Sequence, residues 1–129
     1  MRIEHFALWT SDIERIKAFY VTYFGADAGA LYSNPRTGFV SYFLSFASGP
    51  RLELMQMPGT TPLADRSERH YHGYVHLAMA VGSREEVDRL TERLRRDGVP
   101  VISEPRTTGD GYYESVVLDP DGNRVEITI

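Results

Sequence analysis

Four side chains in the sequence could together hold a metal ion: His5, Glu53, His76 and Glu126. Two imidazoles and two carboxylates make a mixed nitrogen and oxygen ligand set, which suits Zn, Ni, Co, Mn or Fe(II). The sequence contains no cysteine, so thiolate metal sites, thiol nucleophiles and disulfides are excluded. We therefore expect one divalent metal ion per site, with water in any remaining position, and no organic cofactor.

The spacing of these four residues follows an internal repeat. His5 and Glu53 are 48 positions apart, and His76 and Glu126 are 50 positions apart. Residues 1–25 and 72–98 each combine a short apolar strand pattern, a Ser-x-x-Glu helix start at Ser11 or Ser83, and a terminal glycine. Residues 44–56 and 118–129 each contain a turn glycine, then an arginine, then a glutamate. The chain is therefore predicted to be a duplicated module.

Each module is predicted to contain a strand, a helix and three further strands. The first has strands near 2–9, 28–32, 38–47 and 51–57 and a helix near 12–24; the second has strands near 73–81, 100–103, 112–118 and 123–128 and a helix near 84–97. Residues 58–71 are rich in Pro, Thr and charge and are expected to link the modules. We thus expect a single domain over residues 1–129, with module one at 1–57, the linker at 58–71 and module two at 72–129.

Strand alternation predicts where the four candidate ligands point. Side chains alternate between the two faces of a strand. Each candidate ligand adjoins at least one bulky apolar residue, such as Leu52 and Leu54 around Glu53 or Phe6 after His5, and these are suited to packing under a helix. If each sheet curls with its helix outside, the ligands face a concave interior, where an unpaired carboxylate would be costly and a cation would stabilise it. The expected fold is α+β, with two tandem βαβββ modules forming an open cup-like barrel.

Composition excludes several classes of partner. The chain has 129 residues, of which 42% are hydrophobic, and its net charge is −4. A mildly acidic protein lacks the basic face that nucleic acids and anionic membranes require. The N-terminal residues do not form a signal-peptide pattern, and no apolar stretch approaches the length of a membrane span. The expected partner is a small molecule, and the expected compartment is the cytoplasm.

The segments IEHFALWTSD and YYESVVLDPDGNRVEI, together with the repeated element order, resemble the vicinal-oxygen-chelate superfamily over the whole chain. This superfamily includes glyoxalase I, extradiol dioxygenases and bleomycin-resistance proteins. The order His, Glu, His, Glu is similar to that of bacterial glyoxalase I. The resemblance implies a lyase or isomerase that acts on a small substrate with vicinal oxygens through a metal-stabilised enediolate. It also implies Glu126 as the base, with Glu53 second, and a homodimer whose sites are shared between chains.

Two positions depart from the glyoxalase I pattern. Trp9 and Met57 stand where that family has an arginine and an asparagine that help to hold glutathione. The resemblance therefore implies glyoxalase-like metal chemistry, and these two departures argue against a glutathione adduct as the substrate. Aromatic and apolar side chains are expected to line the substrate pocket, namely Trp9, Tyr42, Met57, Tyr112 and Tyr113.

Two other functions stay open. An Fe(II) extradiol-type dioxygenase would use His5, His76 and Glu126 as a facial triad, although a fourth ligand at Glu53 would fill a position needed by oxygen or substrate. A non-enzymatic, bleomycin-resistance-like protein would bind a drug or ligand in an aromatic cleft without a metal. His70 and His72, near the end of the linker, are interpreted as solvated loop histidines.

Overall fold

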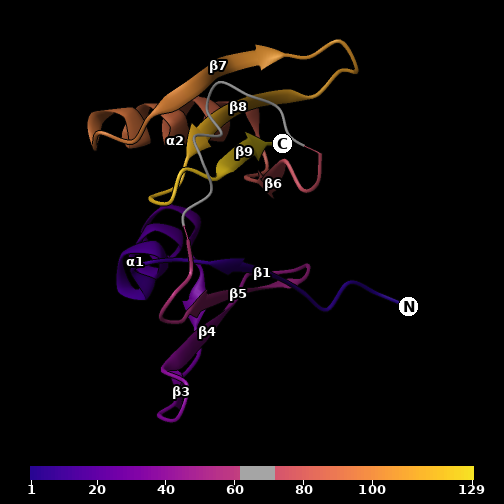
Figure 1. The fold of residues 1–129 in the computed structure, drawn as a ribbon. Helices are drawn as coiled ribbons and strands as arrows, with labels where there is room; N and C mark the ends of the chain where they lie inside the picture. Colours follow the sequence, from indigo (N-terminus) through magenta and orange to yellow (C-terminus); the bar gives the residue numbers. More distant parts are fainter. Residues whose placement is uncertain (62–71) are drawn as a thin grey trace. The chain divides into compact units, whose positions relative to one another are not determined.

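The computed structural model describes residues 1–61 and 72–129 and divides the chain into two compact units, Met1–Leu63 and Ala64–Ile129 (Figure 1). Each unit has one open sheet and one helix packed against it, so the α+β class and the two-module organisation agree with the prediction. Most of the expected linker, including His70, lies outside the described residues. No helix within the described ranges is long and apolar enough to cross a membrane.

The first unit is built around a parallel pair of strands. Its elements are β1 (His5–Trp9), α1 (Ile13–Phe24), β2 (Asp27–Ala28), β3 (Tyr32–Asn34), β4 (Phe39–Ser45) and β5 (Arg51–Gln56). The sheet order is β1-β5-β4-β2, with β3 also paired to β4. β1 and β5 run parallel, and the other pairs are antiparallel.

The segment predicted as one strand at 28–32 forms two short strands. Ala28 pairs with Leu44 and Tyr32 pairs with Ser41, so this segment has one more residue between its two pairings than β4 has. An extra residue on one strand interrupts the ladder and bends the chain, as in a β-bulge. Hydrophobic pattern alone does not disclose such a change of register.

The second unit repeats this topology. Its elements are β6 (His76–Ala80), α2 (Arg84–Arg96), β7 (Val101–Thr107), β8 (Tyr113–Leu118) and β9 (Arg124–Thr128). The sheet order is β6-β9-β8-β7, and β6 and β9 run parallel, as β1 and β5 do. In both units the first and last strands are therefore neighbours, which is what brings a histidine and a glutamate to the same part of the sheet.

The two helices begin with different capping residues. Ser83 accepts a hydrogen bond from the Glu86 amide at 3.2 Å, as predicted for α2. In α1 the capping residue is Asp12, which accepts from the Arg15 amide at 3.0 Å, and not the predicted Ser11. The Gln56 side chain accepts a hydrogen bond from the amide of Ile13 at 2.8 Å, which satisfies the first N–H group of the helix. Gly25 ends α1 in the left-handed conformation, with φ of 62°, which glycine adopts without strain.

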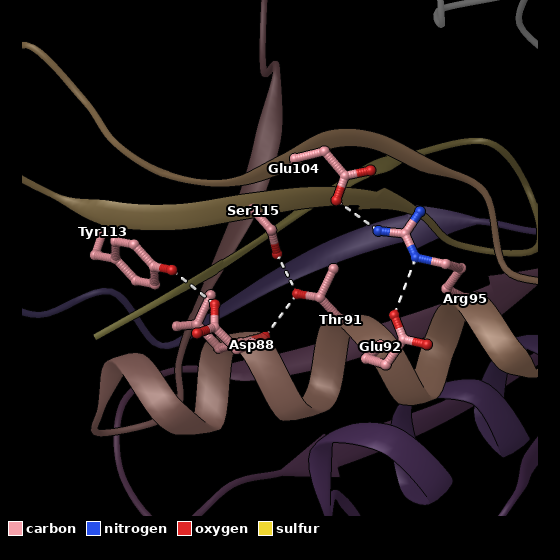
Figure 2. A network of polar contacts seen from close by, with 8 residues as sticks. Asp88, Thr91, Glu92, Arg95, Glu104, Tyr113 and Ser115 are labelled. Atoms are coloured by element: carbon pink, nitrogen blue, oxygen red, sulfur yellow. Dashed lines mark hydrogen bonds and ion pairs between the residues drawn. The ribbon is translucent and has the colours of Figure 1, made fainter.

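Each helix covers the sheet face opposite the candidate ligands, but the two interfaces differ in chemistry. In the first unit α1 buries Ile16 and Tyr20 against Leu44, Leu52 and Leu54. In the second, α2 buries apolar side chains and also a hydroxyl pair, since Thr91 Oγ1 and Ser115 Oγ are 2.6 Å apart. Figure 2 shows this pair between two further contacts of the helix with the sheet, from Tyr113 to Asp88 at 2.7 Å and from Arg95 to Glu104 at 2.5 Å.

Candidate functional site

In the first unit the parallel β1–β5 pair brings His5 and Glu53 together. His5 is paired with Arg51 and Ala7 with Glu53, so His5 and Glu53 lie on the same face two positions apart. Leu52 and Leu54, which alternate with Glu53, are buried on the helix-covered face. The Nε2 atom of His5 lies 3.7 Å from Oε2 of Glu53. The predicted alternation of ligand and core residues is thus present in this unit.

The second unit contains the equivalent pair. His76 is paired with Arg124 and Ala78 with Glu126, which repeats the offset of the first unit. Val125 and Ile127 point to the opposite face and are fully buried. The Nε2 atom of His76 lies 3.2 Å from Oε2 of Glu126. Each unit therefore presents one imidazole nitrogen and one carboxylate oxygen side by side.

These distances fit two neighbouring ligands of a single ion. Donors at about 2.1 Å from one metal lie about 3.0 Å apart at a right angle and about 3.4 Å apart at a tetrahedral angle. The separation in the second unit falls in this range, and that in the first is slightly longer. Exposure is also similar in the two units, with carboxylates at 16% and 14% and imidazoles at 39% and 44%. The donor chemistry and the spacing both fit a divalent metal.

One pair alone does not complete a metal site. Within residues 1–61 and 72–129, no group of three or more His, Asp or Glu side chains is gathered closely enough to hold an ion. The four-ligand set requires the His5–Glu53 pair and the His76–Glu126 pair to meet. That set, in one chain or across two, stays a prediction.

The His5 ring is held from several sides. Its Nδ1 contacts Oε2 of Glu4, and Oε1 of Glu4 accepts from Arg51 Nε at 2.9 Å. The Phe43 ring meets His5 edge-on with centroids 5.4 Å apart, and the Arg51 guanidinium lies 4.1 Å from the Phe43 centroid. The hydrogen bond from His5, followed by that from Arg51, lowers the pKa of Glu4. Sequence reasoning used Arg51 only as a repeat marker and missed Glu4, although Glu4 adjoins the histidine.

The surroundings of Glu126 are acidic. Glu114 lies on the neighbouring strand β8 and on the same face of the sheet as Glu126. It is paired with Thr128, two residues from Glu126, and its side chain is 13% exposed. Burial, followed by the hydrogen bond and charge of Glu114, raises the pKa of Glu126 to about 7. Arg106 offsets this only in part, with Nη2 at 3.9 Å from Glu114. A bound cation would stabilise this pair of carboxylates, which supports the fit to a metal. Strand alternation could have identified Glu114, because it shares a face with Val116 and Leu118.

The expected pocket residues separate into two groups. Trp9 is exposed on the same face as His5, its ring centroid is 6.1 Å from that of Phe39, and Phe39 is 6.1 Å from Tyr32. These three rings, from β1, β4 and β3, form an aromatic row on the Glu53 face of the sheet. Met57 is half-buried just beyond the end of β5.

Tyr42 and Tyr113 lie on the helix-covered faces, where the pocket prediction did not place them. Tyr42 is paired with Leu54, its hydroxyl donates to Glu14 at 2.9 Å, and Lys17 Nζ lies 4.3 Å from its ring centroid. The Tyr113 hydroxyl donates to Asp88 of α2. These contacts occupy both hydroxyls and direct the rings towards the helices. Tyr112 is exposed in the turn before β8.

Residues 2–127 match the protein family described as the Glyoxalase/Bleomycin resistance protein/Dioxygenase superfamily. The chain belongs to this superfamily. It is 28% identical to the lactoylglutathione lyase of Salmonella typhimurium over 98% of this chain and 91% of that protein. It is 30% identical to the uncharacterized protein YwkD of Bacillus subtilis over 97% of this chain and 94% of that protein.

Solved structures agree with this assignment. The trypanothione-dependent glyoxalase I of Leishmania major superimposes on 99% of this chain and 86% of its own, with a TM-score of 0.78 and 26% identity. The glyoxalase fold is therefore established, as the resemblance of the terminal segments implied. At these identities the superfamily is shared, whereas the individual reaction is not fixed by the likeness.

Proposed function

We propose that this superfamily member is a metal-dependent lyase or isomerase of the glyoxalase type, acting on a small substrate with two adjacent oxygens. The observation that carries the proposal is the pair of equivalent contacts, His5–Glu53 at 3.7 Å and His76–Glu126 at 3.2 Å. The likeness to the Salmonella lactoylglutathione lyase and to the Leishmania glyoxalase I supports the same reaction class.

In this proposal the four residues hold one divalent ion, and the carboxylates also handle the proton. The ion, when bound, supplies a Lewis acid that stabilises negative charge on the two substrate oxygens. Glu126 takes the proton from the substrate carbon and returns it, with Glu53 as the second candidate. Burial, followed by the hydrogen bond and charge of Glu114, raises the pKa of Glu126 to about 7 in the metal-free protein. A bound cation would lower that pKa, so Glu126 in the loaded enzyme would be ionised and able to accept the proton of the substrate.

The substrate is proposed to carry an apolar or aromatic group and not a glutathione moiety. Trp9 occupies one position where glyoxalase I has a glutathione contact, and it belongs to the aromatic row with Phe39 and Tyr32 on the Glu53 face. Met57, at the other such position, offers a thioether and no hydrogen-bond donor. Stacking surfaces of this kind select for flat or apolar groups.

We further propose a cytoplasmic homodimer in which each site takes His5 and Glu53 from one chain and His76 and Glu126 from the other. Two equivalent half-sites in one chain are suited to a two-fold assembly, because both sites are then completed together. Light scattering on the purified protein tests this: a mass of twice 14.6 kDa is expected, and a strict monomer would require both pairs to meet within one chain.

The first experiment measures metal content by elemental mass spectrometry. Untagged protein, purified without a chelator, is expected to carry about one divalent ion per chain. His76→Ala is expected to lose it, whereas His72→Ala, at an exposed loop position, is expected to retain it. Wild-type protein that binds no Ni, Zn, Mn or Fe(II) would contradict the proposal and favour metal-independent ligand binding.

The second experiment measures turnover of the loaded enzyme. Adducts of α-ketoaldehydes with glutathione and with apolar thiols are compared, and Glu126→Gln is the inactive reference. The proposal expects turnover of the apolar adducts in preference to the glutathione adduct. Oxygen consumption with catechols, in place of isomerisation, would identify the dioxygenase alternative.

A further inference from the structure

His5 is oriented by a neighbour that is not itself a candidate ligand. Glu4 contacts Nδ1 of His5 with one carboxylate oxygen and receives the Arg51 guanidinium on the other. The backbone reinforces this arrangement, since the Arg51 amide donates to the Glu4 carbonyl at 3.1 Å. Arg51 also covers the Phe43 ring, which meets the His5 ring edge-on. The imidazole is therefore held by one hydrogen bond and one ring contact, with Nε2 directed towards Glu53.

The contact with Glu4 determines which ring nitrogen carries the proton. An ionised carboxylate can only accept a hydrogen bond, so Nδ1 of His5 must donate. In the neutral imidazole Nε2 then keeps its lone pair, and this is the atom that lies beside Glu53. A metal ligand needs that free lone pair. An isolated histidine side chain prefers the opposite tautomer, so Glu4 supplies a preference that the residue does not have by itself.

The second unit lacks this arrangement. Val75 precedes His76 where Glu4 precedes His5, and Val116 stands opposite Glu126 where Phe43 stands opposite Glu53. Arg124 is paired with His76 as Arg51 is with His5. Among the described residues, no side chain or backbone group hydrogen-bonds to Nδ1 of His76. The duplication therefore provides an internal comparison, with the same ligand in two settings.

We propose that Glu4 is a positioning residue, which fixes His5 in the Nδ1–H tautomer so that Nε2 is ready to bind the divalent ion. The proposal rests on the proposed function, because it assigns Nε2 of His5 to the metal. Carboxylates that hold the second nitrogen of a metal-binding histidine raise metal affinity by about 10- to 100-fold. Glu4 is about half exposed, so the lower end of that range is expected.

The first test does not need the metal. Two-bond ¹H–¹⁵N NMR on histidine-labelled, metal-free protein distinguishes the two tautomers, and His5→Asn assigns the His5 signals among the four histidines. Wild type is expected to show the Nδ1–H form at His5, and Glu4→Leu is expected to shift it towards Nε2–H. Glu4→Gln keeps an acceptor oxygen and should preserve most of the Nδ1–H form. An unchanged tautomer in Glu4→Leu would overturn the proposal.

The second test measures Zn(II) and Ni(II) affinity by competition with a chromophoric chelator. Glu4→Leu is expected to weaken binding about tenfold and Glu4→Gln by less. Glu104→Leu is the matched control, because Glu104 also pairs with an arginine but lies on β7. Equal affinities for wild type and Glu4→Leu would overturn the proposal, as would weaker binding without a tautomer shift. If wild type binds neither ion but the tautomer depends on Glu4, the proposed function fails while the orientation of His5 by Glu4 is upheld.

Discussion

The two units present the same pair of side chains in different surroundings. In the first, the histidine is held by Glu4 and Arg51, and the residue opposite Glu53 is Phe43. In the second, the histidine lacks that contact, and the glutamate has a second carboxylate beside it at Glu114. After duplication, selection on the ligands and selection on their neighbours can act separately. The first unit orients an imidazole, whereas the second tunes a carboxylate.

The strand registers allow the two units to be compared position by position. Ser41 lies two residues before Phe43 on β4, and Glu114 lies two residues before Val116 on β8, so the two positions correspond. Ser41 is buried without bringing charge to the site, whereas Glu114 adds to the effect of burial in raising the pKa of Glu126. A neighbouring carboxylate therefore distinguishes the surroundings of Glu126 from those of Glu53.

The largest effect is expected from removing the proton-transfer group. Glu126→Gln should lower the turnover number by about 10²- to 10⁴-fold, the range typical of a lost general base. Glu53→Gln removes the same charge from the other proposed carboxylate ligand. It should mainly lower the affinity for the metal, with a smaller loss of turnover in the loaded enzyme. Both variants are assayed after measured metal loading. Equal losses at equal loading would show that the two glutamates share the role.

The helix interfaces offer a second contrast, in stability. Thr91 donates to the Val87 carbonyl at 2.6 Å, so the Ser115 hydroxyl must donate to Thr91 (Figure 2). Thr91→Val leaves the buried Ser115 hydroxyl without a partner among the described residues and should cost about 1–3 kcal/mol. Ser115→Ala should lower the free energy of unfolding by less, because the Thr91 hydroxyl still donates to the Val87 carbonyl.

Urea unfolding of both single variants and of the double variant measures this coupling. The double variant should be more stable than the sum of the two single losses predicts. In the first unit α1 buries the apolar Ile16, so Ile16→Val, which removes no hydroxyl, serves as the comparison. Strict additivity at Thr91 and Ser115 would contradict the predicted coupling.

A third prediction concerns pH. Burial and Glu114 raise the pKa of Glu126 from 4.5 to about 7, so the folded metal-free protein retains a proton that the unfolded chain has released. Stability from this group is therefore greatest at low pH and falls as pH rises between about 4.5 and 7. In Glu114→Ser, which copies the first unit, burial remains but the neighbouring charge is lost, and the fall should be shallower.

Urea midpoints at pH 5, 6, 7 and 8 test this prediction on metal-free protein. Glu104→Ser is the control, since it removes an exposed glutamate from β7 and should leave the slope as in wild type. Parallel pH profiles for wild type and Glu114→Ser would show that Glu114 does not influence Glu126.

The smallest effect is expected from a substitution that copies a feature of the first unit into the second. Val75→Glu places a carboxylate before His76, where Glu4 precedes His5, and Arg124 already occupies the position of Arg51. Zn(II) affinity should rise severalfold, below the about tenfold range of natural outer contacts. Val75→Gln controls for size. A decrease in affinity would indicate that the two histidines need different surroundings.

Sequence reasoning predicted the features that depend on periodicity. The duplicated module, both helices and the alternation of Glu53 and Glu126 with buried aliphatic residues follow from local pattern. It could not predict the break between Ala28 and Tyr32, which depends on a register with β4, or the hydrogen bond from Ile13 to Gln56 at the start of α1. Both are decided by residues distant in the sequence.

The candidate site divides in the same way. The His–Glu pairs could be predicted because they repeat, and the repeat carries more information than any one residue. Tyr42 was assigned to the pocket on residue type alone, and its pairing with Leu54 directs it to the helix. Glu114 was missed because it has no counterpart in the first unit, so a search for repeated residues could not identify it.

The parallel pairing of the first and last strands has a consequence for folding. In each unit the histidine comes from the strand that opens the unit and the glutamate from the strand that closes it. A nascent chain therefore carries His5 and His76 for roughly fifty residues before their partners are made. Any ligand shared by the two residues closes a loop of that length, and loop closure removes conformational freedom from the unfolded chain. An ion bound at the proposed site would therefore stabilise the completed unit, because both ligands are in place only after the closing strand has joined the sheet.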